Sequence, residues 1–217
     1  MDDAESRAVF EAVLLPFTLP YRLAQLSEPS QFAPRLFARG CGAFCPVSAG
    51  QHSPSWRAGV AAEGGADLDG GMAFAGLELR LDSAFGLGVA GRLQGFREPL
   101  ESGPEYALLG KSHLVYRFAT FSHVQFYGGL GPRWYVAPSG SVYAGVDLLY
   151  ALHIQLLKPL VAEFEFDLAN VGASFAPEIR GTLGLVAGPV EFYAGWDQHW
   201  IGDATLGGPV GGLRVHF

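Results

Sequence analysis

The stretch Ser141–Ala169, SVYAGVDLLYALHIQLLKPLVAEFEFDLA, contains two runs in which apolar and polar residues alternate. In the first run one face carries Val142, Ala144, Val146, Leu148, Tyr150, Leu152, Ile154 and Leu156, and the other includes Tyr143, Asp147, His153 and Gln155. In the second run Leu160, Ala162, Phe164, Phe166 and Leu168 alternate with Glu163, Glu165 and Asp167. Because successive side chains of a β-strand point to opposite faces, the pattern predicts two long strands joined by a tight turn at Lys158-Pro159.

The same alternation continues through most of the chain from about residue 55. It predicts ten strand-like segments, at residues 55–64, 72–82, 84–96, 105–118, 121–134, 141–156, 160–169, 177–187, 189–198 and 206–217. Segments of this length match tilted strands that cross a bilayer, since strands of globular proteins average only about five or six residues. By this sorting no charge lies on the apolar face of any segment. A charge facing lipid at mid-depth costs about 2 to 4 kcal/mol, so a membrane barrel excludes it.

The composition fits many strands and no membrane helix. Hydrophobic residues make up 49% of the 217 residues and charged residues only 16%. Even so, no stretch reaches the roughly 18 uninterrupted apolar residues that a membrane helix needs. Thirty glycines and 13% aromatic residues suit strands joined by tight turns and banded by aromatic rings. The net charge of -7 argues against nucleic acid as a partner, because phosphate binding relies on clustered Lys and Arg.

The chain ends in GGLRVHF, residues 211–217, with Leu213, Val215 and Phe217 on one face of an extended strand. Together with the alternation, this ending resembles the C-terminal signature of bacterial outer-membrane β-barrels. The resemblance implies an all-β fold, an antiparallel up-and-down transmembrane barrel of about ten strands, with eight as the alternative. It also implies that the bilayer and lipopolysaccharide surround the barrel, and that the three residues form the signal read by the barrel-assembly machinery.

The connections between the expected strands alternate in length. Short turns are expected at residues 82–83, 119–120, 157–159 and 188–189, and longer loops at 65–71, 97–104, 135–140, 170–176 and 199–205. Outer-membrane barrels have short periplasmic turns and longer extracellular loops. We therefore expect an outer-membrane protein whose N- and C-termini both lie in the periplasm.

Residues 1–50 differ from the expected barrel of residues 51–217. Apolar residues within 4–15 have helical spacing and predict a short amphipathic helix that Pro16 ends, followed by an irregular proline-rich stretch. This periplasmic extension could be a plug, an interfacial foot or an arm that binds another membrane or periplasmic protein. Cys41 and Cys45 are a candidate disulfide, because no histidine lies at metal-ligand spacing from them. No metal or cofactor is expected.

Charges of opposite sign concentrate on different parts of the inward face. Basic residues come from the third to fifth segments, namely Arg92, Lys111, Arg117 and Arg133. Acidic residues come mainly from the sixth to ninth, namely Asp147, Glu163, Glu165, Asp167, Glu178, Glu191 and Asp197, with Arg180 among them. Closure of a ten-stranded barrel brings these walls face to face, so we expect ion pairs that fill the lumen. A narrow polar pore or a small-ligand pocket is the alternative.

One other interpretation of the pattern stays open. A soluble barrel or sandwich would show the same alternation with its apolar residues inside and its polar residues in water. Aromatic residues near segment ends, such as Trp56, Phe85, Tyr106 and Phe217, instead favour the girdles of a membrane barrel.

One set of residues resembles a catalytic site. Asp67 and Asp69 in the first long loop, with Asp197 and His199 near the last, are similar to the rim site of the omptin outer-membrane proteases, in which an Asp-His pair activates water. A barrel that modifies lipid A is a second enzymatic alternative, although the adjacent Ser112 and His113 point to opposite faces. The sequence predicts no catalytic role and favours a structural or partner-binding subunit of a complex.

Overall fold

The computed structural model describes Thr18 and residues 56–67, 71–121 and 123–217. The expected helix within residues 4–15, Cys41, Cys45 and Asp69 lie outside the described residues. No helix among the described residues has the length and apolar character that would be needed to span a membrane.

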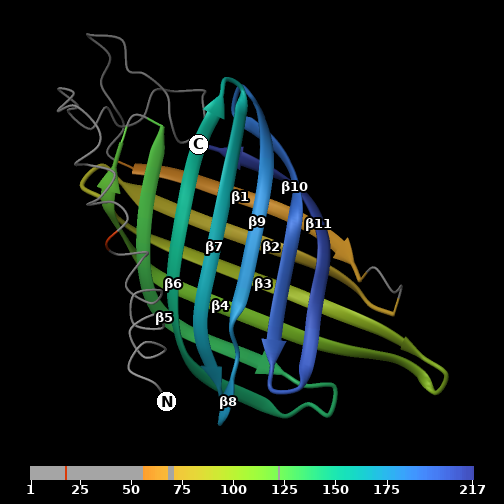
Figure 1. Ribbon diagram of the computed structural model, residues 1–217. Helices are drawn as coiled ribbons and strands as arrows, with labels where there is room; N and C mark the ends of the chain where they lie inside the picture. The colour runs from red at the N-terminus through yellow and green to blue at the C-terminus, as the bar shows by residue number, and fades with distance from the viewer. Residues whose placement is uncertain (1–17, 19–55, 68–70, 122) are drawn as a thin grey trace, which may run out of the picture. The chain divides into compact units, whose positions relative to one another are not determined.

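The described chain is built almost entirely of β-strands (Figure 1). Their bounds are β1 Trp56–Ala66, β2 Ala73–Ser83, β3 Leu87–Leu100, β4 Gly103–Thr120, β5 Val124–Val136, β6 Val142–Leu157, β7 Leu160–Val171, β8 Ser174–Phe175, β9 Glu178–Ala187, β10 Val190–Ile201 and β11 Ala204–His216. Each of the ten predicted segments corresponds to one of the long strands. The two-residue β8 is an addition within the connection from β7 to β9, where it pairs with β7 alone.

The ten long strands close into an antiparallel barrel. Neighbours along the chain pair with each other, with β7 pairing with β9 across the small β8. The ladder between β1 and β11, from Gly59↔His216 to Gly65↔Val210, joins the first strand to the last and completes the ring. The predicted up-and-down barrel is therefore confirmed, with ten strands rather than eight.

The barrel carries its apolar side chains outside and most of its charges inside. Adjacent leucines of β6 illustrate the alternation, because Leu148 is 44% exposed and Leu149 only 5%. Leu77, Leu114 and Leu130 on other strands are each more than half exposed. Fourteen Asp, Glu, Lys and Arg side chains are buried, among them Arg133 and Glu178 at 0% exposure. The alternative arrangement, with the apolar face of each strand inside and the charges in water, is therefore wrong.

Two connections expected to be long loops are tight turns. Strands β3 and β4 stay paired out to Leu100↔Gly103, and β10 and β11 stay paired out to Ile201↔Ala204. Only Glu101–Ser102 and Gly202–Asp203 connect these pairs. The β3–β4 hairpin extends beyond the barrel at residues 97–104, so both of its faces are exposed while its ladder continues (Figure 1). Its sequence is therefore polar on both faces, which is the pattern that suggested a loop.

The lumen is apolar at the end that holds these two turns. Phe74, Phe96, Leu109 and Val210 form a buried cluster there, and Tyr135 packs against it. Sorting by alternation did not predict this cluster, because it treated the whole inward face as polar. The cluster fills that end of the lumen, and the charged residues occupy the remainder. This end is called the capped end below, and the opposite end, where β1 begins and β11 ends, is called the open end.

One glycine of β10 is required by the close approach of β9. A Cβ atom added at Gly195 would fall on the backbone carbonyl oxygen of Gly181. Backbone cannot move aside as a flexible side chain can, so we expect Gly195→Ala to destabilise the barrel by about 1 to 3 kcal/mol. Gly91→Ala is the control, because its new Cβ would meet the Lys111 carbonyl oxygen at an ordinary 3.6 Å. Urea midpoints of the folded barrel compare the two, and equal midpoints would contradict the prediction.

Candidate functional site

Among the described residues, seventeen Asp, Glu, Lys and Arg side chains and four histidines are joined by ion pairs inside the barrel, and we call this set the lumen network. It contains ten acids and seven bases together with four histidines, His113, His153, His199 and His216. The acids are Glu63, Glu78, Asp82, Asp147, Glu163, Glu165, Asp167, Glu178, Glu191 and Asp197, and the bases are Arg57, Arg80, Arg92, Lys111, Arg133, Arg180 and Arg214.

Arg92 on β3 crosses the lumen to acids on several other strands. Its guanidinium donates to Glu178 of β9 at 2.9 Å and to Glu165 of β7 at 2.7 Å. It also donates to Glu78 on the adjacent β2 at 3.2 Å. A hydrogen bond from a charged donor to a charged acceptor is about twice as strong as a neutral one. Arg92 therefore ties opposite walls of the barrel together.

Glu178 receives cations from three consecutive strands. Besides Arg92, the ammonium of Lys111 on β4 donates to it at 2.7 Å, and Arg133 on β5 donates at 2.8 Å. Lys111 also donates to Asp167 on β7. The basic wall of strands β3 to β5 thus meets the acidic wall of β7 and β9, as the charge distribution along the sequence predicted.

A second group lies between β1, β3, β9 and β10. Arg180 donates to Asp197 at 2.7 Å and also to Glu63. The Gln94 amide donates to Asp197 at 2.8 Å and to Glu63 at 3.1 Å, and the Tyr193 hydroxyl donates to Glu63 at 3.0 Å. Glu63 was missed by the sequence analysis, although its position in the alternation of β1 carried the signal.

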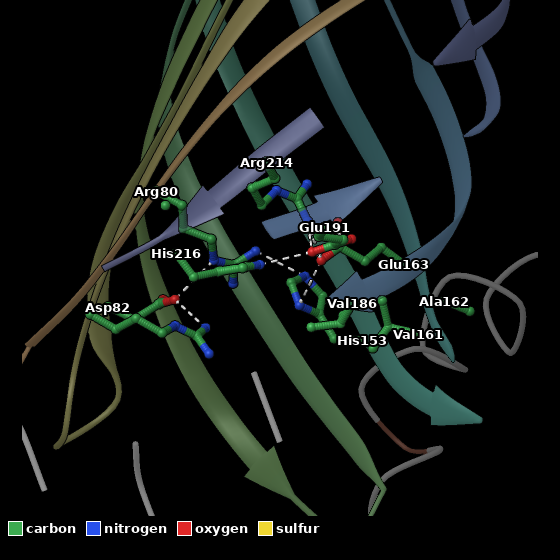
Figure 2. Close-up of a pocket in the computed structure, with 12 residues that line it drawn as sticks. Arg80, Asp82, His153, Val161, Ala162, Glu163, Val186, Glu191, Arg214 and His216 are labelled. Atoms are coloured by element: carbon green, nitrogen blue, oxygen red, sulfur yellow. Dashed lines mark hydrogen bonds and ion pairs between the residues drawn. The ribbon is translucent and has the colours of Figure 1, made fainter. Parts of the chain in front are cut away.

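The third group lines a hollow at the open end of the lumen (Figure 2). Arg214 donates to Glu163 at 2.8 Å and to Glu78 at 3.1 Å, while His216 lies 2.9 Å from Glu191. The hollow has a volume of about 470 Å3, including the part open to solvent. Both acidic and basic side chains line the hollow, so its surface carries charges of both signs that pair with each other.

The Asp-His pair expected at the rim lies instead in the buried core. Asp197 and His199 are almost completely buried, with His199 Nε2 3.3 Å from Asp197 Oδ1 and His199 Nδ1 3.1 Å from Glu178 Oε2. Asp67 is partly exposed in the connection after β1. The rim location is therefore wrong, because β10 continues to Ile201 and its alternation turns Asp197 and His199 inward.

Two other predicted sets lie outside the lumen network. Arg117 donates to the carbonyl oxygen of Ala84 at 3.4 Å, near the short turn after β2, and forms no cross-lumen ion pair with a described residue. Leu213 of β11 and Phe217, which directly follows that strand, are exposed on the outer face. Their expected role in assembly stays a prediction.

Three clusters in the lumen have the residue types of metal ligands. They are His113 with Asp147 and Asp167, Glu178 with Asp197 and His199, and Glu165 with Asp167 and Glu178. Residue spacing does not indicate these clusters, because their members come from strands that meet only when the barrel closes. In the last two clusters Arg92, Lys111, Arg133 or Arg180 already donates to the carboxylates.

Comparison of the sequence with protein-family models found no match, and comparison with curated proteins found none. The geometry itself indicates what the lumen network can do. Every acid of the network lies within 4.0 Å of an Arg or Lys of the network. Carboxylates paired in this way hold strands together.

Removing Arg92 tests the structural importance of the network. We expect Arg92→Leu to destabilise the barrel by about 3 to 5 kcal/mol or to prevent folding, because it leaves buried carboxylates without their partner. Arg97→Leu is the matched control, since Arg97 belongs to the same strand but is exposed on the hairpin. Urea titration of the folded form measures both variants, and a wild-type midpoint for Arg92→Leu would contradict the account.

Proposed function

We propose that this chain is an integral outer-membrane β-barrel that serves as a structural or partner-binding subunit and has no catalytic role. The observation that carries the proposal is the combination of an apolar outer surface with an ion-paired interior. Apolar surface favours hydrocarbon over water by about 25 cal/mol per Å2. Soluble monomers rarely expose contiguous apolar patches beyond a few hundred Å2, whereas here exposed Leu, Val, Ile and aromatic residues occur on all ten long strands.

The dimensions of the barrel support a bilayer as its surroundings. A transmembrane strand needs about 9 to 11 residues when it is tilted. The shortest barrel strand, β9, has 10 residues. Every strand of the ring is therefore long enough to cross the hydrocarbon core.

Aromatic side chains lie on the outer face toward both ends of the barrel. Trp56, Phe192 and Phe217 are exposed toward the open end, and Tyr106 and the partly exposed Trp134 lie toward the capped end. Trp56 and Phe85 meet edge to face with their ring centroids 5.9 Å apart. Aromatic rings prefer the boundary between hydrocarbon and head groups, so the two bands support a membrane-spanning orientation.

The turns support a periplasmic position for the open end. Its connections are residues 84–86, 121–123, 158–159 and 188–189, all of three residues or fewer. The capped end has two turns of two residues, but its other connections, residues 67–72, 137–141 and 172–177, are longer. In outer-membrane barrels the short turns face the periplasm. In this orientation Phe217 lies on the periplasmic side, where the barrel-assembly machinery would read it, and lipopolysaccharide surrounds the capped end. The first strand then begins on the periplasmic side, so residues 1–50 would be available there to bind a membrane or periplasmic partner.

The filled lumen supports a structural role over a wide channel. The apolar cluster around Phe96 occupies the capped end, and ion pairs cross the middle of the barrel. Small barrels are filled by side chains in this way. The Asp197 carboxylate, the best candidate for catalysis, already accepts hydrogen bonds from Arg180 and Gln94.

The membrane location can be tested on the expressed full chain. We expect it to stay with the outer-membrane fraction after washing with alkaline carbonate and to need detergent for extraction. Unheated samples should migrate differently from boiled ones on gels, because a closed barrel resists unfolding by detergent. Folded protein that is soluble without detergent would overturn the proposal.

A charge on the outer face tests the same claim residue by residue. Leu130 lies at the middle of β5 and is 58% exposed, so Leu130→Arg should cost about 2 to 4 kcal/mol in the membrane. Leu100→Arg is the matched control, because Leu100 lies at the tip of the β3–β4 hairpin, where we expect about 0 to 1 kcal/mol. Refolding into lipid vesicles at graded urea concentrations measures both. Equal costs at the two positions would contradict a lipid-facing β5.

A further inference from the structure

His113 of β4, Asp147 of β6 and Asp167 of β7 converge at one point in the lumen. All three are at most 3% exposed. His113 Nε2 lies 3.3 Å from Asp147 Oδ2 and 3.9 Å from Asp167 Oδ1. One ligand atom from each residue lies within 4.8 Å of the other two. The cluster therefore combines one imidazole nitrogen with two carboxylates at close range.

Four polar atoms of this cluster have no hydrogen-bond partner among the described residues. They are His113 Nε2, both carboxylate oxygens of Asp147 and Oδ1 of Asp167. A buried polar atom without a partner costs about 1 to 3 kcal/mol, and such atoms are rare in folded proteins. Because one ligand atom from each residue lies close to the other two, the cluster suits a ligand that accepts electron pairs from nitrogen and oxygen.

The charge balance of the lumen network points the same way. At the open end Arg57, Arg80 and Arg214 balance Asp82, Glu163 and Glu191. In the remaining core four bases face seven acids, which leaves an excess of three negative charges. A bound divalent cation would offset two of these charges.

We propose that His113, Asp147 and Asp167 bind a divalent transition-metal ion inside the barrel. Ligand atoms about 2.1 Å from a tetrahedral zinc ion lie about 3.4 Å apart, close to the His113 separations. A set of one imidazole and two carboxylates suits Zn2+ or Mn2+ better than Mg2+, which prefers oxygen ligands and water.

The neighbouring bases would orient the carboxylates toward the ion. Lys111 donates to Asp167 Oδ2, which leaves Oδ1 directed at His113. Arg133 Nη1 lies 3.5 Å from Asp147 Oδ2. Outer partners of this kind fix the direction of metal ligands. A hollow lined by His113, Lys111, Leu149 and Glu165 adjoins the site and has room for a further ligand such as water.

The bound ion would act as a cross-link. Strands β4 and β6 are separated by β5, so no backbone ladder joins them. A metal held by His113, Asp147 and Asp167 would connect β4 directly to the β6–β7 pair. Its binding energy would add to the stability of the folded barrel, because the unfolded chain does not hold the three ligands together.

The experiment uses the full chain with Cys41→Ser and Cys45→Ser, so that no thiolate contributes a second zinc site. The folded barrel is purified in detergent, freed of loosely bound metal, and equilibrated with Zn2+, Mn2+ or Mg2+. Elemental analysis should find close to one Zn2+ or Mn2+ per folded chain and no retained Mg2+. The unfolding temperature should rise with Zn2+.

Two variants locate the ion. His113→Ala and Asp147→Asn should lose the retained metal and the rise in unfolding temperature. His153→Ala is the matched control, because His153 is an equally buried lumen histidine that lies 3.4 Å from Glu163 and outside the cluster. If the two variants do not fold, the Co2+ absorption spectrum of the unsubstituted site should still report nitrogen and oxygen ligation.

Three results would overturn the proposal. They are a folded barrel that retains no Zn2+ or Mn2+, retention that survives His113→Ala, and retention that His153→Ala abolishes instead. The first would leave the cluster as buried polar groups with no bound ion. None of these results depends on whether lipid surrounds the barrel, so the metal site and the membrane location fail separately.

Discussion

A charged side chain enclosed in a narrow barrel needs an opposite charge within reach, and the structure of this protein depends on that constraint. Removing one partner of a buried ion pair costs about 3 to 5 kcal/mol, which is comparable to the total stability of many small domains. Arg92, Lys111 and Arg133 approach Glu178 from three consecutive strands, so one carboxylate fixes the distance between two walls. The barrel can close in this register only if the bases of β3 to β5 face the acids of β7 and β9.

The same constraint explains the outer surface. Because the lumen holds the charges, alternation directs the other half of the side chains outward, and these are apolar. A shift of one residue in any ladder would exchange the two sets and bring charges onto the apolar surface. The ion pairs therefore specify the register as well as the closure. An arrangement of this kind is stable where the surroundings are hydrocarbon, which is why we propose a membrane barrel.

Most of the fold was predictable from the sequence, and the details of the lumen were not. The alternation of apolar and polar residues over long segments predicted the ten strands, because the direction of each side chain in a strand depends only on its local position. The partners of each charge depend on the stagger of distant strands. Asp197 and His199 were expected at the rim because the continuation of β10 to Ile201 has no local signal. Phe74 on β2 and Phe96 on β3 pack together in the apolar cluster at the capped end. The alternation of apolar and polar residues within each strand does not indicate this contact.

If the proposed membrane location is correct, the apolar side chains of each strand contact lipid and the alternate side chains face the paired interior. Leu148 and Leu149 test it directly, because the same residue type points outward at one position and inward at the next. Spin labels would be placed at each in turn, in the barrel without Cys41 and Cys45 reconstituted in bilayers. The account predicts that the label at 148 collides with dissolved oxygen far more than with a water-soluble nickel complex, and that the label at 149 is shielded from both. A label at 148 that meets the nickel complex more often than oxygen would contradict the account.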